Sequence, residues 1–335
     1  MKTQTILLTE EQVQSLMDWK TAVRIAEELL REQGNGNVLL PPELLLSLRG
    51  RGLDSYLSAM PAYLEYLGLA GTKWGGGYGE NNKTGNLPYM MQVAILSSPI
   101  TGEIYSIMGS TWLTTIKTGS ETALSGKFLA KSDDLVVTVI GAGLQGRASV
   151  RCWLALDELG DISVQELRVV DLNRQKSEKV AAEARDAHPG KSIEVFDNVR
   201  ESVDGAHVVI TATTATEPFV DRAWLRDDVL IASIGSFPEF DPQAILDADK
   251  LVVDNWEQNK HQGDFSKLIE EGKIARDDIH GELPEIVAGK VPGRESSDEM
   301  IAANLVGLAS VDLSIAWEVY RRAKAEGVGT IFSFL

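Results

Sequence analysis

The chain has 335 residues, of which 44% are hydrophobic, so it is long enough and apolar enough for two domains with sizeable cores. Its 49 acidic and 32 basic residues leave a net charge of −17, which disfavours nucleic acid and anionic membrane surfaces as partners. The single cysteine, Cys152, excludes an intrachain disulfide, and we find no signal peptide or membrane-spanning run. These features predict a soluble, cytoplasmic protein with a buried structural thiol.

The first part of the chain predicts an α+β unit. Thr9 and Gln12 form a capping box before a helical pattern that ends at Gly34, Asn35 and Gly36. From residue 41 to about 107 the pattern is mostly strand and turn, and it includes the glycine-rich stretch "LAGTKWGGGYGENNKTGNLP". Residues 111–130 predict a helix, and the polar "KSDD" that follows marks a domain boundary.

After this boundary the chain alternates between strands and helices. Six short apolar strands are predicted in "LVVTVIG", "ELRVVD", "SIEVF", "AHVVITAT", "VLIASIG" and "KLVVD". The alternation is typical of a Rossmann fold, a doubly wound parallel sheet with helices on both faces. The amphipathic helix near the C-terminus is expected to pack back onto the N-terminal domain.

The stretch "VVTVIGAGLQGRAS" carries the pattern of a dinucleotide-binding turn. Gly141 allows the tight turn, Gly143 lets the backbone approach a pyrophosphate, and Gly146 lets helix and strand pack closely. Asp171 ends the next strand and would accept hydrogen bonds from ribose hydroxyls, which favours NAD. Arg174 leaves room for the 2′-phosphate of NADP, and a Rossmann-like sheet without any cofactor is the alternative.

From about Ile6 to the C-terminus, the chain resembles the ornithine cyclodeaminase/mu-crystallin family. The resemblance rests on "AMPAYL", "GTKW", "ILSSPITGEIYSIMGSTWLTTIKTGSETALSGKFLA", "VIGAGLQG", "VVITATTATEPFV", "IHGELPEIVAGKVPGRESSDE" and "GLASVDLSIAWEVY". It implies a homodimer in which residues 1–130 and 308–335 form a substrate-binding and dimerisation domain. The Rossmann domain, residues 131–307, is inserted between them. Members exchange a hydride between C2 of an amino acid or its imine and a nicotinamide.

The resemblance also assigns site residues. Lys73 matches the lysine at the substrate centre, where it either holds the substrate carboxylate or carries a proton. Lys117 stands where most members carry a carboxylate-binding arginine. Trp74, Met60 and Asn304 are further expected substrate-binding residues, although a core position for Trp74 is an equal alternative. The expected cofactor-binding residues are Gly141, Gly143, Leu144, Gln145, Gly146, Asp171, Asn173, Arg174, Thr213, Ile234 and Gly235.

Two departures from the family pattern bear on the chemistry. Phe237 occupies the place of an aspartate found in many members, and Glu239 or Asp241 is a candidate substitute. Asn304 replaces an acid in a turn near the last helix. The "VVDNW", "PGRE" and "VGT" stretches place the chain nearest to the family's opine-type branch, whose members also lack the aspartate.

For the remaining polar residues, Asp312 and the four histidines, the sequence favours structural roles or leaves a structural role open. Asp312 is expected to cap the last helix or to interact with its dipole. The four histidines, His188, His207, His261 and His280, lack metal-ligand spacing, so no metal site is predicted. His261 and His280 are expected either to be structural or to line the cofactor cleft.

Three functions therefore remain open. The first is an NAD(P)-dependent amino-acid dehydrogenase or imine reductase with a small-molecule substrate. An opine-type dehydrogenase is one form of this function. The second is an ornithine or lysine cyclodeaminase that needs a substitute for the missing aspartate. The third is a non-catalytic ligand-binding protein of the mu-crystallin kind.

Overall fold

The computed structural model describes residues 3–131 and 134–334 and divides the chain into two compact units. Unit 1 comprises Met1–Lys117 and Leu308–Leu335, and unit 2 comprises Thr118–Gly307. The first division falls inside helix α4 (Thr111–Leu129), not after residue 130, because the second half of α4 packs into unit 2. A Cβ atom at Gly119 would lie 2.6 Å from the Ala148 carbonyl group, and one at Gly126 would lie 2.0 Å from the Trp153 ring.

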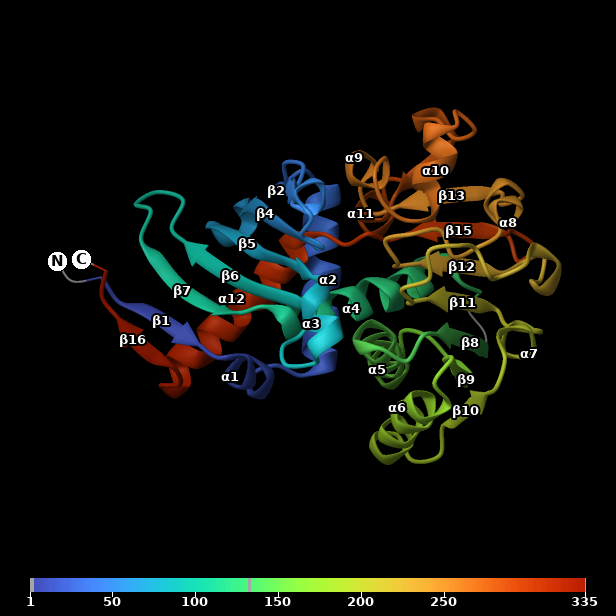
Figure 1. The fold of residues 1–335 in the computed structure, drawn as a ribbon, viewed down its shortest axis with the longest axis horizontal. Coiled ribbons are helices and arrows are strands. Elements are labelled where there is room, and N and C mark those ends of the chain that lie inside the picture. Colours follow the sequence, from blue (N-terminus) through green and yellow to red (C-terminus); the bar gives the residue numbers. More distant parts are fainter. Residues whose placement is uncertain (1–2, 132–133, 335) are drawn as a thin grey trace. The chain divides into compact units, whose positions relative to one another are not determined.

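Unit 1 is built on a mixed, mostly antiparallel sheet (Figure 1). Its strand order is β16-β1-β7-β6-β5-β4-β2, with β3 paired to β4 and β1 parallel to β7. The strands are β1 (Thr5–Leu8), β2 (Val38–Leu39), β3 (Leu44–Ser47), β4 (Ser55–Leu64), β5 (Leu69–Tyr78), β6 (Met90–Ser97), β7 (Ile104–Gly109) and β16 (Thr330–Phe332).

Helices cover one face of this sheet. The helices of unit 1 are α1 (Glu10–Ser15), α2 (Trp19–Gly34), α3 (Gly79–Thr84), the first half of α4 and α12 (Ala309–Glu326), with short 3-10 turns η1 (Arg49–Arg51) and η2 (Glu65–Leu67). The last long helix, α12, contacts β4 to β7 and α2, which confirms that it packs back onto the N-terminal part of the chain. Both hydrogen bonds of the predicted Thr9–Gln12 capping box are present.

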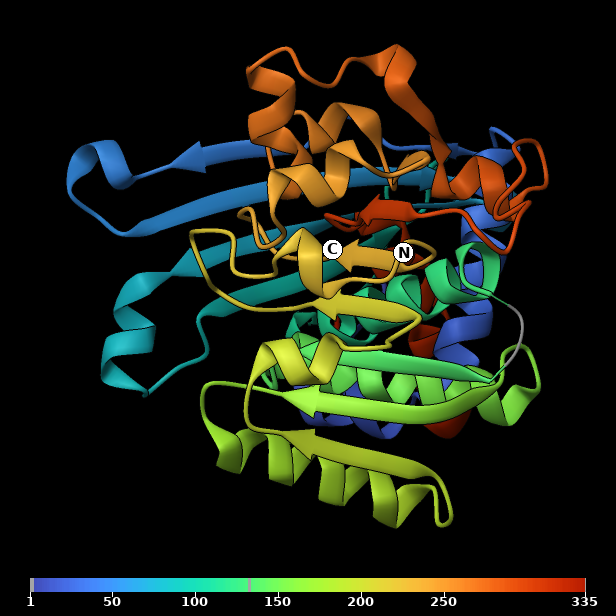
Figure 2. The same cartoon turned by 90° about the vertical axis from the view of Figure 1, so that its right-hand side faces the viewer.

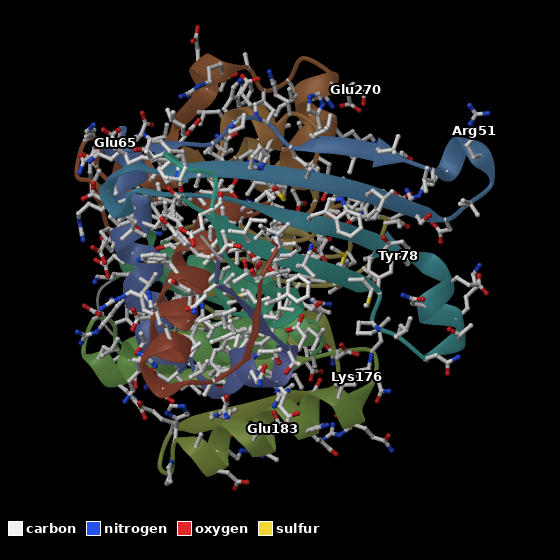
Figure 3. All side chains as sticks on the ribbon, turned by 90° about the vertical axis from the view of Figure 1, so that its left-hand side faces the viewer. Arg51, Glu65, Tyr78, Lys176, Glu183 and Glu270 are labelled. Carbon is white, nitrogen blue, oxygen red and sulfur yellow. The ribbon has the colours of Figure 1, made fainter. Side chains whose placement is uncertain are left out.

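The other face of the unit 1 sheet and its β3–β4 hairpin carry exposed apolar side chains. Figure 3 shows this hairpin with Arg51 at its turn, and Tyr78 at the end of β5 before α3. The largest exposed apolar residues on these strands and their connections are Leu39, Leu44, Leu45, Leu46, Leu53, Trp74 and Met91. Water contact with so many large apolar groups in one region is unfavourable, and patches of this kind mark interaction surfaces.

Unit 2 is built on a parallel sheet (Figure 2). Its first strand, β8, lies inside the sheet, with β9 and β10 on one side and β11 to β15 on the other. The order is β10-β9-β8-β11-β12-β15-β13-β14. The strands are β8 (Leu135–Ile140), β9 (Val164–Val170), β10 (Ser192–Phe196), β11 (Val208–Thr211), β12 (Leu230–Ser233), β13 (Lys250–Val253), β14 (Ile279–Glu282) and β15 (Ile301–Asn304). After β10 the chain crosses to the other side of β8 and continues with β11, so the order in which strands are added changes between β8 and β11. Rossmann folds bind ligands at such a point.

The predicted Rossmann fold is thus confirmed, and all six predicted strands are present. The strands β14 and β15 were not predicted, because "IHGE" and "IAAN" lack the run of large apolar residues that marks the other short strands of this sheet. The helices of unit 2 are the rest of α4, α5 (Leu144–Leu159), α6 (Arg174–Ala187), α7 (Val199–Val203), α8 (Pro242–Leu246), α9 (Trp256–Asn259), α10 (Asp264–Glu270) and α11 (Leu283–Val287), with 3-10 turns η3 (Arg222–Trp224) and η4 (Arg276–Asp278). Figure 3 shows α6, which carries Lys176 and Glu183.

The interior of unit 2 explains the inert character expected of Cys152. This residue is fully buried on α5, and burial raises the pKa of its thiol to about 12. The thiol is therefore protonated at neutral pH and serves as a packing group. Within the described residues, no helix combines the length and apolarity that a membrane span needs.

Close packing between α4 and α5 gives a first prediction. Gly126→Ala would place a methyl group against the rigid Trp153 ring, so the free energy of unfolding should fall by about 1–3 kcal/mol. Gly50→Ala is the control, since a Cβ there meets nothing within 4 Å. Urea unfolding measures both variants, and equal midpoints would contradict the packing described here.

Candidate active site

The glycine turn of unit 2 has the geometry of an anion-binding helix N-terminus. Strand β8 ends at Ile140, Gly141 takes a φ of +103°, and Gly143 is the N-cap of the 16-residue helix α5. A Cβ at position 146 would lie 1.7 Å from the Gly141 carbonyl oxygen, so only glycine fits there. A Cβ at position 143 would meet nothing within 4 Å. The backbone at Gly143 is therefore open to a ligand, and the first N–H groups of α5 are available to a phosphate.

Asp171 is placed at the edge of this turn. Its carboxylate accepts hydrogen bonds from the N–H groups of Ala142 and Asn173, both at 2.8 Å. These contacts orient the carboxylate directly after β9, where an acid can bind ribose hydroxyls. Asn173 itself caps α6 by accepting a hydrogen bond from the Gln175 N–H.

Arg174 is already paired with acidic side chains. Its guanidinium lies 2.8 Å from Glu178 and also contacts Asp197. Both partners would compete with a 2′-phosphate, so the arrangement favours NAD over NADP.

The other expected cofactor residues lie at the carboxyl edge of the same sheet. Leu144 and Gln145 form the first turn of α5, and Leu144 is exposed. Thr213 follows β11, and Ile234 and Gly235 follow β12. Strand ends of a parallel sheet meet at one edge, so these residues lie on the side of the sheet that carries the glycine turn.

The structure separates the two candidate substitutes for the missing aspartate. Asp241 is the N-cap of α8, where its carboxylate accepts a hydrogen bond from the Gln243 N–H at 2.9 Å. Glu239 is fully buried and bonds to Thr213. Phe237, which occupies the position of the family aspartate, is 41% exposed and lines a cavity of unit 2.

The side chain of Asn304 is hydrogen-bonded to other residues of unit 2. It is fully buried at the end of β15, where its side-chain oxygen accepts a hydrogen bond from the Asp264 N–H at 3.1 Å. Its side-chain nitrogen donates to Asn259 and to the Gln262 carbonyl oxygen. These bonds hold its amide in the interior of unit 2, and the expected role in substrate binding stays a prediction. The neighbouring sequence "NLVG" could not show these bonds, because the partners come from a distant segment.

In unit 1, Lys73 forms a buried ion pair. Its Nζ lies 2.9 Å from Asp312 Oδ2, and the two side chains are 6% and 0% exposed. Lys73 comes from β5 and Asp312 from the first turn of α12, so the pair joins the sheet to the last helix. The adjacent carboxylate stabilises the positive charge of the ammonium in this nearly dry environment.

Thr114 and Gln92 complete this polar cluster. Thr114 Oγ1 lies 2.8 Å from Asp312 Oδ1, 2.7 Å from Gln92 Oε1 and 3.4 Å from Lys73 Nζ. A threonine hydroxyl has one proton, so it donates either to Asp312 or to Gln92. If it donates to Asp312, the Gln92 amide must turn so that its NH2 group donates to Thr114.

Sequence analysis missed three features of this cluster. Asp312 lies in the first turn of α12, which suits the expected interaction with the helix dipole, and its carboxylate also binds Lys73 and Thr114. Gln92 and Thr114 were not singled out at all. The available signal was a polar residue on the buried face of an apolar segment, Gln92 in "YMMQVAIL".

Helix α4 is held in place by Glu10. The two oxygens of its carboxylate accept hydrogen bonds from the N–H groups of Thr111 at 2.7 Å and Trp112 at 3.1 Å. The acid thereby satisfies free donors at the start of the helix and favours its dipole. Lys117 lies three residues after Thr114 on α4 and is 3% exposed. The two positions share one side of the helix.

Met60 and Trp74 lie on opposite faces of the unit 1 sheet. Met60 is buried on β4 directly opposite Lys73 in the antiparallel register. Trp74 follows Lys73 in β5, so its side chain points to the other face, where it is 49% exposed. The expected common pocket of Lys73 and Trp74 therefore does not form within unit 1, because side chains alternate along a strand.

The histidines take separate positions. His207 accepts a hydrogen bond from the Val136 N–H, His280 bonds to the Pro292 carbonyl group, and His188 pairs with Glu158. His261 lines a cavity of about 1030 Å³ in unit 2, together with Phe237 and Asp264. In the described part of the chain, no three His, Cys, Asp or Glu side chains gather as a metal site would require.

Comparison with known proteins gives a consistent result over the whole chain. A family model described as the ornithine cyclodeaminase/mu-crystallin family matches residues 3–327. A curated relative from Staphylococcus aureus, N-((2S)-2-amino-2-carboxyethyl)-L-glutamate dehydrogenase, is 29% identical over 81% of this chain and 80% of its own.

Two solved structures are similar in both sequence and fold. An archaeal alanine dehydrogenase dimer with bound NAD has a TM-score of 0.90 and 30% identity, covering 99% of this chain and 100% of that one. The Δ1-pyrroline-2-carboxylate reductase of Thermococcus litoralis, in complex with NADH and L-proline, has a TM-score of 0.89 and 31% identity, covering 97% and 99%.

The buried ion pair gives a second prediction. Lys73→Met should lower the free energy of unfolding by about 3–5 kcal/mol, because it leaves the Asp312 carboxylate buried without its cation. Adding Asp312→Leu to Lys73→Met should restore much of the loss. Lys83→Met is the control, since Lys83 pairs with Glu80 at the surface and should change stability by less than about 1 kcal/mol. A double variant that is as unstable as the two single variants combined would contradict the coupling.

Proposed function

Because the chain belongs to the ornithine cyclodeaminase/mu-crystallin family, we propose that it is an NAD-dependent oxidoreductase acting at C2 of a small amino acid, its imine or an opine-type N-substituted amino acid. The observation that carries this proposal is the open glycine turn of unit 2 with Asp171 at its edge. The nicotinamide supplies or accepts the hydride when it is bound.

Unit 2 provides the dinucleotide site in this proposal. The turn from Gly141 to Gly146 and the first N–H groups of α5 hold the pyrophosphate. Asp171 binds the adenosine ribose hydroxyls. The acidic partners of Arg174 make NAD the preferred cofactor over NADP.

Unit 1 provides the groups that bind and orient the substrate. Among the described residues, 3–131 and 134–334, the Lys73 ammonium contacts Asp312 and Thr114. The ammonium has three N–H donors, so one is left for a substrate carboxylate. Lys117 adds a second positive charge on α4, and Met60 lies beside Lys73 on the sheet. A carboxylate held in this way fixes C2 for hydride transfer.

The residue at the family's aspartate position favours a dehydrogenase or reductase over a cyclodeaminase. Phe237 cannot activate an amine or a water molecule, and Asp241 is used as a helix cap. A net change of the nicotinamide redox state is therefore expected in each turnover.

We also propose a homodimer formed through the exposed apolar surface of the unit 1 sheet. One solved relative is a dimer, and a surface carrying several exposed leucines with Trp74 needs a cover. A reducing compartment such as the cytoplasm suits a chain whose single cysteine is a buried thiol.

The proposed activity predicts oxidation of NADH with a suitable substrate. The purified protein is incubated with NADH or NADPH and three sets of compounds: cyclic imines, 2-oxo acids with ammonia, and 2-oxo acids with amino acids. Absorbance at 340 nm should fall, faster with NADH, and mass spectrometry should show a new saturated C–N bond. Ammonia release from ornithine or lysine without a net absorbance change would instead establish a cyclodeaminase.

Gly143→Ala tests the cofactor site directly. Its φ of −75° suits alanine and its Cβ meets nothing, so the unfolding midpoint of the apo protein should not change. The new methyl group should weaken NADH binding about tenfold or more, a loss of about 1.4 kcal/mol for each factor of ten. Gly146→Ala is the comparison, since it should damage both folding and binding through the contact with the Gly141 carbonyl group. Unchanged NADH affinity in Gly143→Ala would place the pyrophosphate elsewhere.

A further inference from the structure

One buried carboxyl group connects the loop after β11 with the loop after β12. Glu239 is fully buried, and its Oε1 accepts hydrogen bonds from the Thr213 N–H at 3.0 Å and the Thr213 hydroxyl at 2.5 Å. On the other side, its Oε2 would lie 2.4 Å from a Cβ at position 235. Glycine at position 235 therefore leaves the space that the carboxyl group occupies. Glu239 touches both loops at the carboxyl edge of the sheet.

The main chain around Glu239 is also held firmly. The N–H groups of Glu239 and Phe240 both donate to Asp264 Oδ1 at 2.8 Å. The Glu239 carbonyl oxygen accepts a hydrogen bond from the Phe219 N–H at 2.9 Å. Asp264 is itself bound through its N–H to the Asn304 side chain. With its backbone fixed on both sides, Glu239 can hold Thr213 in one place.

The charges around Glu239 make this contact sensitive to protonation. The titratable group that acts on it is Asp264 of α10, a second carboxyl whose own pKa is raised by burial, while Thr211 and Thr213 face it with neutral hydroxyls. Its Oε2 and the Thr211 hydroxyl are both buried without a hydrogen-bond partner among the described residues, and Thr211 acts on the Glu239 carboxyl group. Burial, with a further contribution from Asp264, raises the pKa of Glu239 to about 7.

We propose that Glu239 is a positioning residue of the dinucleotide site, and that its protonated carboxyl group holds the loops after β11 and β12 in the arrangement that binds the cofactor. In this form one oxygen accepts from Thr213 and the other donates to the Thr211 hydroxyl. Loss of the proton leaves a buried negative charge beside Asp264, and the carboxylate gains by moving toward water, which releases Thr213 and Gly235. The inference rests on the proposed function, because these loops matter to a ligand only if the dinucleotide binds there.

The test compares NADH affinity of the purified full-length protein at pH 6 and pH 8.5, measured by nucleotide fluorescence. The wild-type dissociation constant should rise about tenfold toward pH 8.5, since the protonated form binds and is lost above a pKa of about 7. Glu239→Gln keeps the size and the neutral charge, so its affinity should be the same at both pH values and close to the wild type at pH 6. Asp241→Asn is the matched control in the same loop, where an exposed cap loses its charge, and it should keep the wild-type pH dependence.

A second measurement uses the wild type alone and does not depend on the folding of Glu239→Gln. Calorimetric titration with NADH at pH 7.5, in two buffers of different ionisation enthalpy, should show uptake of a proton on binding. Zero uptake, a flat wild-type profile or a Glu239→Gln profile as steep as the wild type would each overturn the role of Glu239. Absence of NADH binding at every pH would overturn the proposed function and this inference together.

Discussion

The parallel sheet of unit 2 imposes the constraint on which its site depends: every strand ends at the same edge. Parallel pairing brings the ends of β8, β9, β11, β12 and β15 together, although they are spread from Ile140 to Asn304 along the chain. The glycine turn, Asp171, Thr213 and Gly235 all follow from this one arrangement. The edge also collects buried polar groups, since the backbone and side chains leaving the strands need partners away from water.

The buried carboxyl groups of Asp312 and Glu239 have opposite electrostatic surroundings. Asp312 in unit 1 has a lysine at 2.9 Å and a hydroxyl at 2.8 Å, so its charge is compensated. Glu239 in unit 2 has hydroxyls, a backbone N–H and another acid, but no cation in the described environment. The first arrangement pairs the carboxylate with a cation, whereas burial without a cation raises the pKa of Glu239 to about 7. The proposed roles suit these environments: the charged Lys73 beside Asp312 binds the substrate carboxylate, and the neutral Glu239 holds two loops.

Several expectations changed because contacts between distant segments outweigh local pattern. Trp74 adjoins Lys73 in sequence but faces the other side of β5, since strand side chains alternate. Asn304 stands where many family members carry an acid, and its amide forms hydrogen bonds with Asn259, Gln262 and Asp264. Asp312 was expected to cap the last helix or to interact with its dipole, and it is also the partner of Lys73, which lies 239 residues earlier in the chain. The partners of Asn304 and Asp312 depend on contacts that spacing along the sequence cannot reveal, whereas the orientation of Trp74 follows from its position next to Lys73 in a strand.

The sequence by itself determined the Rossmann fold and the glycine turn followed by Asp171, because each depends on a local pattern. Strand and helix periods and the tight turn at Gly141, which needs a positive φ, can be read within a few residues, whereas the role expected of Lys73 came from the family resemblance. Only the tertiary structure decided the partners of the buried charges, the place of β15 between β12 and β13, and the end of unit 1 inside α4. The reason is physical: a buried charge or a central strand is stabilised by whatever packs against it, and those neighbours come from remote parts of the chain.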